Sequence, residues 1–73
     1  MVKLYSKNGC PQCKMTKRML TERGIDFVEI NTTEHPEYIE KLKNRGIKSL
    51  PVVDTETDSW TGFQPTKINA LIK

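Results

Sequence analysis

Two cysteines separated by two residues, Cys10 and Cys13, are the side chains of this sequence most able to perform chemistry. A thiolate is a strong nucleophile, and two thiols at this spacing can close a small disulfide that forms and opens readily. Pro11, between them, suits the first position of a helix. A helix beginning there directs unpaired N–H groups and the positive end of its dipole at Cys10, which stabilises a thiolate. The pair therefore predicts thiol–disulfide exchange.

Two other interpretations of the cysteine pair stay open on these residues alone. A closed zinc site requires four ligands, and the sequence adds only His35 to the two thiols, so a metal would have to be shared between chains. The second alternative is a pair of buried, inert cysteines, because free cysteine is among the most buried residue types.

The elements that position the cysteines can be read from the first part of the chain. Residues 2–6 alternate apolar and polar side chains and predict a strand, whereas helix formers dominate residues 11–23 and Gly24 follows them. Residues 25–31 predict a second strand. The cysteines thus lie at the carboxyl end of a strand, where α/β sheets place their sites, and we expect Cys10 to be accessible.

The rest of the chain completes an α/β sandwich. A second helix should begin near Pro36 and end before Gly46, a third strand should occupy residues 49–55, and a short fourth strand should lie near Ser59. Residues 65–72 predict a last helix. The order βαβαββα implies a four-stranded mixed sheet with three helices, with the first two strands parallel and the last two forming a hairpin.

Length and composition exclude several classes of protein. The 73 residues suffice for a single domain, residues 1–73, with no room for a second core. Neither a secretion signal nor an apolar run approaching the roughly 20 residues of a membrane helix is present, so we expect a cytoplasmic protein without a membrane partner. The net charge of +3 is mild, and no basic–aromatic alternation indicates nucleic-acid binding. We also expect a monomer.

A proline beside a redox cysteine pair gives the first family resemblance. The segment Ser49-Leu50-Pro51-Val52-Val53, with the cysteine pair, resembles the thioredoxin superfamily. This resemblance implies a thioredoxin-like fold in which Pro51 is cis and lies against the cysteines. It also implies that the backbone of Leu50 pairs with the bound substrate like an added strand.

The cysteine motif resembles the glutaredoxin branch of that superfamily. Residues 6–13, S-K-N-G-C-P-Q-C, resemble its S-K-x-x-C-P-Y-C site, with Gln12 in place of tyrosine. Lys7 matches a lysine that helps to bind the carboxylate of glutathione, although a merely solvated Lys7 is an equal alternative. In either case its charge favours a nearby thiolate. Pro11 and Gln12 are accordingly expected to contact the partner.

The segment after the fourth strand departs from the glutaredoxins. They carry a G-G-x-[ST/D]-D stretch that binds glutathione, whereas this chain has W-T-G-F-Q-P, with one glycine and no aspartate. Together with C-x-Q-C, this motif resembles the NrdH-type redoxins over the whole length of the chain. The residues that the resemblance adds to the partner-binding set are Trp60, Thr61, Gly62, Phe63, Gln64 and Pro65.

The two aromatic residues of this motif are expected to differ. For Trp60 we weigh core packing against a partner contact and favour packing, whereas we expect Phe63 to be exposed or to face a partner. An apolar patch beside a thiolate would suit docking onto another protein.

The resemblance to the NrdH-type redoxins implies an electron carrier with two protein partners. It implies that Cys10 attacks a target disulfide and that Cys13 resolves the mixed disulfide. Thioredoxin reductase would re-reduce the pair and class Ib ribonucleotide reductase would receive the electrons. FAD and NADPH belong to the reductase, and we expect the chain itself to bind no cofactor and no metal. The alternatives are a glutathione-dependent glutaredoxin and a non-catalytic module such as a metal-binding chaperone.

Overall fold

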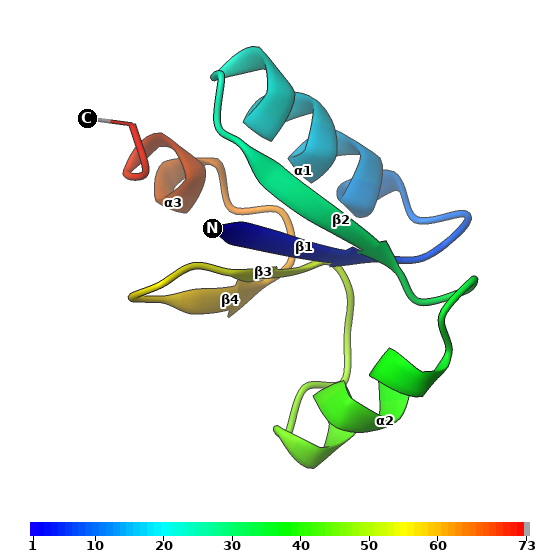
Figure 1. Cartoon of the computed structure of the whole chain (residues 1–73). Coiled ribbons are helices and arrows are strands. Elements are labelled where there is room, and N and C mark those ends of the chain that lie inside the picture. Colours follow the sequence, from blue (N-terminus) through cyan, green and yellow to red (C-terminus); the bar gives the residue numbers. More distant parts are fainter. Residues whose placement is uncertain (73) are drawn as a thin grey trace.

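The computed structural model describes residues 1–72, and within them the elements follow the predicted order (Figure 1). The strands and helices are β1 (Val2–Ser6), α1 (Pro11–Glu22), β2 (Phe27–Asn31), α2 (Glu37–Asn44), β3 (Val52–Asp54), β4 (Ser59–Thr61) and α3 (Pro65–Asn69). The expected α/β architecture, a four-stranded mixed sheet with three helices, is confirmed. No helix in this part of the chain has the length and apolar character that crossing a membrane would require.

The sheet has the order β2-β1-β3-β4, which makes β1 and β3 its two central strands. β1 and β2 run parallel and are joined through α1, because parallel neighbours need a crossover connection. β3 is antiparallel to β1, and β4 forms an antiparallel hairpin with β3. Leu4 on β1 thereby lies between Glu29 on β2 and Val53 on β3.

Helices cover both faces of the sheet, with α1 and α3 on one face and α2 on the other (Figure 1). Neighbouring strand residues point to opposite faces, so each strand supplies both layers. The layer under α1 and α3 contains Leu4, Leu20, Val53, Trp60 and Ile68. The layer under α2 contains Tyr5, Leu42 and Val52.

Three elements are shorter than the sequence predicts. β2 begins at Phe27 because the N–H of Ile25 donates to the carbonyl of Leu20, at 3.0 Å, and closes the end of α1. β3 is confined to Val52–Asp54. α3 ends at Asn69, since the N–H groups of Leu71 and Ile72 bond carbonyls three residues back, as in a 3₁₀ turn.

An ion pair joins the end of α2 to the hairpin. The guanidinium of Arg45 donates to both carboxylate oxygens of Asp54, at 2.8 and 3.0 Å, and the hydroxyl of Ser59 donates to the same carboxylate at 2.7 Å. The bond from Arg45, followed by that from Ser59, holds the pKa of Asp54 below its usual value of 3.8, against the opposing effect of burial.

We expect Asp54→Asn to lower the free energy of unfolding at pH 7 by about 1 kcal/mol, because Arg45 loses its charge-assisted partner. A carboxyl group whose pKa is lowered by folding contributes stability above its unfolded pKa, 3.8 here, and loses it as the pH falls through the lowered value. The difference between wild type and variant should therefore close below pH 3.8 in urea titrations.

The control for this substitution is Glu56→Gln, because Glu56 pairs with the N-terminal amine at a site where both groups are exposed. It should leave stability unchanged. A difference in the free energy of unfolding between wild type and Asp54→Asn that stays constant down to pH 2 would contradict the proposed contribution of the ionised Asp54 to stability.

Candidate thiol–disulfide site

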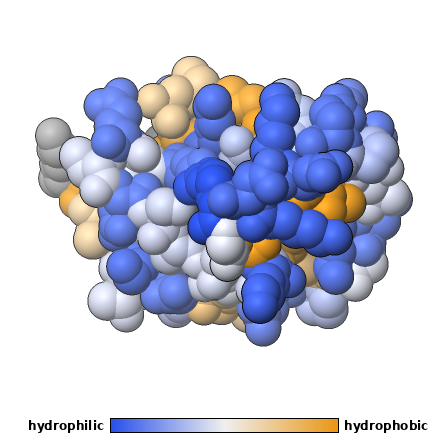
Figure 2. Space-filling model, turned by 90° about the horizontal axis from the view of Figure 1, so that it is seen from below, coloured by the Kyte–Doolittle hydropathy of each residue, from blue (hydrophilic) through white to orange (hydrophobic). Residues whose placement is uncertain are grey.

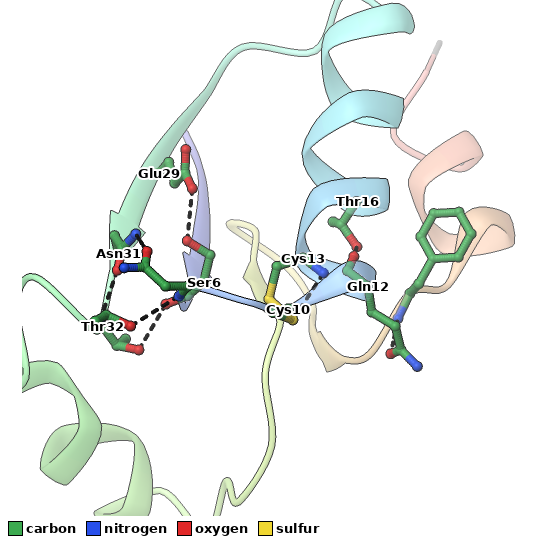
Figure 3. Close-up of a disulfide and its surroundings, with 11 residues drawn as sticks. Ser6, Cys10, Gln12, Cys13, Thr16, Glu29, Asn31 and Thr32 are labelled. Atoms are coloured by element: carbon green, nitrogen blue, oxygen red, sulfur yellow. Dashed lines mark hydrogen bonds between the residues drawn. A yellow bond between two sulfur atoms is a disulfide. The ribbon is translucent and has the colours of Figure 1, made fainter.

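The two cysteines form a disulfide at the N-terminus of α1 (Figure 3). Cys10 is the N-cap residue and Pro11 is the first residue of the helix, as the sequence predicts. The Cα atoms of the cysteines are 5.2 Å apart, and the N–H of Cys13 donates to Cys10 Sγ at 3.1 Å. A sulfur that accepts this bond at the positive end of a helix is in a setting that stabilises negative charge.

Cys10 is more buried than the sequence led us to expect. The exposed fraction is 6% for Cys10 and 3% for Cys13, so the expectation of an accessible Cys10 is wrong for the oxidised protein. Cys10 still borders a shallow depression of about 400 Å³. The other residues of this depression, which we call the Cys10 depression, are Lys7, Gly9, Pro11, Gln12, Ser49, Leu50, Thr61 and Gly62.

The segment before β3 forms one wall of the Cys10 depression. The Leu50–Pro51 peptide bond is cis, as the family resemblance implies, and Pro51 is fully buried. Leu50 is half-buried, and its N–H and C=O take part in none of the backbone hydrogen bonds formed within residues 1–72. These free backbone groups beside the depression are available to an extended chain.

The turn after β4 forms the opposite wall and is tied to both neighbouring segments. The N–H of Gly62 donates to the carbonyl of Pro51 at 2.9 Å, and the N–H of Phe63 donates to the side-chain oxygen of Gln12 at 3.3 Å. Gly62 has φ of +81°, a left-handed conformation that side chains other than glycine rarely adopt. The turn therefore needs its single glycine.

Gln12 is the residue whose position the sequence could not foresee. It lies between the two cysteines in sequence, and its side chain points away from them toward the turn after β4 (Figure 3). Its main-chain carbonyl accepts a bond from the hydroxyl of Thr16 at 2.8 Å. Gln12 thus joins the first turn of α1 to the W-T-G-F-Q-P segment.

The aromatic residues of that segment pack inward. Trp60 is 6% exposed and belongs to the core, which confirms the packing interpretation and removes its ring from the partner-facing surface. Phe63 is half-buried against the same cluster, so its ring is neither fully exposed nor part of the core, and its contact with a partner stays a prediction. Gln64 donates to the carbonyl of Thr61 at 2.8 Å and Pro65 begins α3, so these two residues shape the turn rather than line the depression.

A hydrogen-bonded group on the other side of the disulfide fixes the end of β1 (Figure 3). The carbonyl of Ser6 accepts bonds from the N–H and the hydroxyl of Thr32, at 2.7 and 2.8 Å. The hydroxyl of Ser6 donates to Glu29 at 2.8 Å, and Lys17 pairs with the other carboxylate oxygen at 2.8 Å. The bond from Lys17 is the main cause of the lowered pKa of Glu29, so this carboxylate stays ionised and paired.

Cys13 borders a second depression, of about 320 Å³, on the side of this group. Its lining includes Lys7, Lys14, Lys17 and Glu29. Lys17 follows Cys13 by one helical turn on α1, so helix periodicity alone places them on one face. No sequence signal marked Glu29, because β2 comes close to the cysteines only in the folded sheet.

No ligand set for a metal accompanies the cysteines within residues 1–72. No group of three or more His, Cys, Asp or Glu side chains in this part of the chain could hold a metal ion. His35 instead lies 3.8 Å from Glu37 and contacts the ring of Tyr38 edge-on.

Comparison with known proteins places this geometry in a family. The glutaredoxin family model matches residues 2–59. The glutaredoxin-like protein NrdH of Lactococcus lactis subsp. cremoris (strain MG1363) is 44% identical over 71 residues, which cover 97% of this chain and 99% of the relative. The chain belongs to the NrdH group of the glutaredoxin family. NrdH of Escherichia coli K12 is also 44% identical, over 96% of this chain and 86% of that protein.

Solved structures of the family confirm the thioredoxin-like fold. The NrdH-redoxin of Escherichia coli superposes with a TM-score of 0.91 at 44% identity, covering 96% of this chain and 92% of that one. A glutaredoxin from Archaeoglobus fulgidus superposes with a TM-score of 0.82 at 32% identity, covering 99% of this chain and 85% of that one. The protein is therefore an NrdH glutaredoxin-like redox protein, and its disulfide is the redox group.

We expect Gln12→Ala to free the N–H of Phe63 while costing less than about 1 kcal/mol of stability, because the lost bond is long and solvent-exposed. Amide exchange at Phe63, measured by NMR, should become about two- to five-fold faster. Lys14→Ala is the control, because Lys14 is an exposed residue of the same helix that lines the depression beside Cys13, whose lining includes no residue of the turn after β4. Unchanged exchange at Phe63 in Gln12→Ala would show that the bond does not hold the turn.

Proposed function

We propose that this protein is a dithiol electron carrier that reduces protein disulfides, with class Ib ribonucleotide reductase as its target and thioredoxin reductase as its reductant. The position of Cys10 at the N-terminus of α1, where its sulfur accepts the N–H of Cys13, carries the chemical part of the proposal. The partner assignment rests on membership of the NrdH group. A solved relative from Escherichia coli is described as a glutaredoxin-like protein with a thioredoxin-like activity profile.

The proposed reaction is a two-step exchange. The thiolate of Cys10 attacks one sulfur of the target disulfide, which forms a mixed disulfide and releases the other target sulfur as a thiolate. Cys13 then loses its proton, and its thiolate attacks Cys10 Sγ. The target leaves with two reduced sulfurs. The two electrons come from the Cys10–Cys13 pair, which is oxidised to a disulfide.

Regeneration needs an external donor of two electrons. In the proposal, thioredoxin reductase supplies them from NADPH through its FAD and opens the Cys10–Cys13 disulfide. The chain itself holds no cofactor in this scheme. Lys7, in the lining of the Cys10 depression, would favour the thiolate of Cys10. Phe63 follows the lining residue Gly62 in sequence, and the exposed part of its half-buried ring would be available for docking.

The lining of the Cys10 depression argues against glutathione as the reductant. None of its residues is acidic, so nothing there pairs with the amino group of glutathione's γ-glutamyl end. The backbone N–H groups of Gly62 and Phe63, at the place where glutaredoxins carry their glycine-rich stretch, are taken by Pro51 and Gln12.

A coupled assay tests the assignment of the reductant. NADPH, thioredoxin reductase and this protein should reduce a protein disulfide such as that of class Ib ribonucleotide reductase, as measured by NADPH consumption. Glutathione with glutathione reductase should support less than about a tenth of that rate. The reverse order of the two rates would favour a glutathione-dependent glutaredoxin.

Two cysteine substitutions test the order of the steps. We expect Cys10→Ser to abolish transfer, because the attacking sulfur is gone. Cys13→Ser should still attack but should accumulate the mixed disulfide with the target, visible as a covalent adduct on a non-reducing gel or by mass spectrometry. Normal turnover of protein disulfides by Cys13→Ser would contradict the dithiol mechanism.

A further inference from the structure

A groove next to the Cys10 depression lies between α2 and the segment that leads to Pro51. Its volume is about 220 Å³, and we call it the α2 groove. Its lining consists of the apolar residues Ile39, Leu42, Ile47 and Leu50, the lysines Lys7, Lys43 and Lys48, and the small polar residues Thr32 and Ser49.

The α2 groove continues into the Cys10 depression. Lys7, Ser49 and Leu50 line both, so a chain bound across Cys10 reaches the groove without leaving the surface. Leu50 also has the free backbone N–H and C=O described above. Strand-like pairing with Leu50 would lead the bound chain from one depression to the other.

The floor of the α2 groove is apolar. Leu42 is buried, Ile47 and Leu50 are half-buried, and Ile39 is a large apolar side chain with 38% of its surface exposed. Figure 2 views the molecule from the side that carries α2 and shows hydrophobic surface between hydrophilic residues. An apolar side chain inserted there would be removed from water, which is favourable by about 25 cal/mol per Å².

The rim of the α2 groove is positively charged and uncompensated. It carries Lys7, Lys43 and Lys48 and no acidic residue. None of these three lysines forms an ion pair with another described residue, in contrast to Lys17 and Lys67. A ligand that brings negative charge would therefore meet three unpaired cations.

We propose that the α2 groove binds the segment that flanks the disulfide of a target protein, and that this segment is extended and combines an apolar side chain with acidic residues. The inference deepens the proposed function, because it names the chemistry by which the same site selects its protein substrate. The apolar side chain fills the floor between Ile39 and Ile47, and the carboxylates face Lys43 and Lys48.

The test compares three disulfide peptides that differ only beside the reactive cysteine. Each peptide carries one cysteine joined to a small chromogenic thiol, and the flanking residues are leucine with glutamates, leucine with lysines, or serine with glutamates. The reduced protein should consume the leucine–glutamate peptide with a kcat/KM at least about five-fold above either other peptide. The ratio of kcat/KM for the leucine–glutamate peptide to kcat/KM for the leucine–lysine peptide should fall in high salt.

Variants of the α2 groove test whether its residues cause the preference among the peptides. Lys43→Gln combined with Lys48→Gln should lower kcat/KM for the leucine–glutamate peptide about five-fold. The matched control, Lys3→Gln with Lys41→Gln, removes the same charge elsewhere, since Lys3 lies beside Asp54 and Lys41 over the Tyr38 ring. Ile39→Ser should abolish the preference for leucine over serine while retaining the preference for glutamate over lysine.

A small neutral substrate, hydroxyethyl disulfide, separates groove binding from thiol chemistry. The wild type, the two double lysine variants and Ile39→Ser should all reduce hydroxyethyl disulfide at the same rate. Equal kcat/KM for the glutamate and lysine peptides would overturn the inference and leave the proposed function standing. An equal loss of rate toward hydroxyethyl disulfide and the leucine–glutamate peptide in Lys43→Gln/Lys48→Gln would overturn it too. Failure to reduce any disulfide would instead refute the proposed function.

Discussion

The packing of α1 onto the sheet is the constraint on which the rest of the site depends. Leu20 packs in one buried cluster with Leu4 and Val53, and Thr16 on the same helix is fully buried. The first turn of the helix is thereby held beyond the carboxyl end of β1. A close-packed layer of this kind allows little movement. Because the helix cannot shift, Cys10 remains at the positive end of its dipole, and Cys13 remains one turn away with its N–H on the Cys10 sulfur.

Three segments that are distant in sequence meet at this end of the sheet and are joined by a small number of hydrogen bonds. The turn after β4 donates one N–H to Pro51 and the next to Gln12, and thereby connects the segment before β3 with the first turn of α1. This arrangement leaves Leu50 with free backbone groups and covers most of each cysteine. The reactive pair is thus shielded from water while one edge stays open to an extended chain.

The distribution of charge around the site complements its shape. Glu29, the acidic residue in the lining of the depression beside Cys13, is held by Lys17, and that bond keeps the pKa of its carboxyl low and its charge compensated. The Cys10 depression and the α2 groove contain lysines and no carboxylate. A thiolate is stabilised in such surroundings, and a negatively charged target segment is attracted by them.

The sequence by itself determined the order of the elements, the placement of the cysteines at a helix N-terminus and the family, because periodicity, Pro11 and short motifs are local properties. It also marked Trp60 as a packing residue. Only the tertiary structure decided the burial of Cys10, the inward packing of Phe63, the bond from Gln12 to the turn after β4 and the continuity between the α2 groove and the Cys10 depression. Each of these depends on segments from different parts of the chain, which come together only when the sheet is covered on both faces.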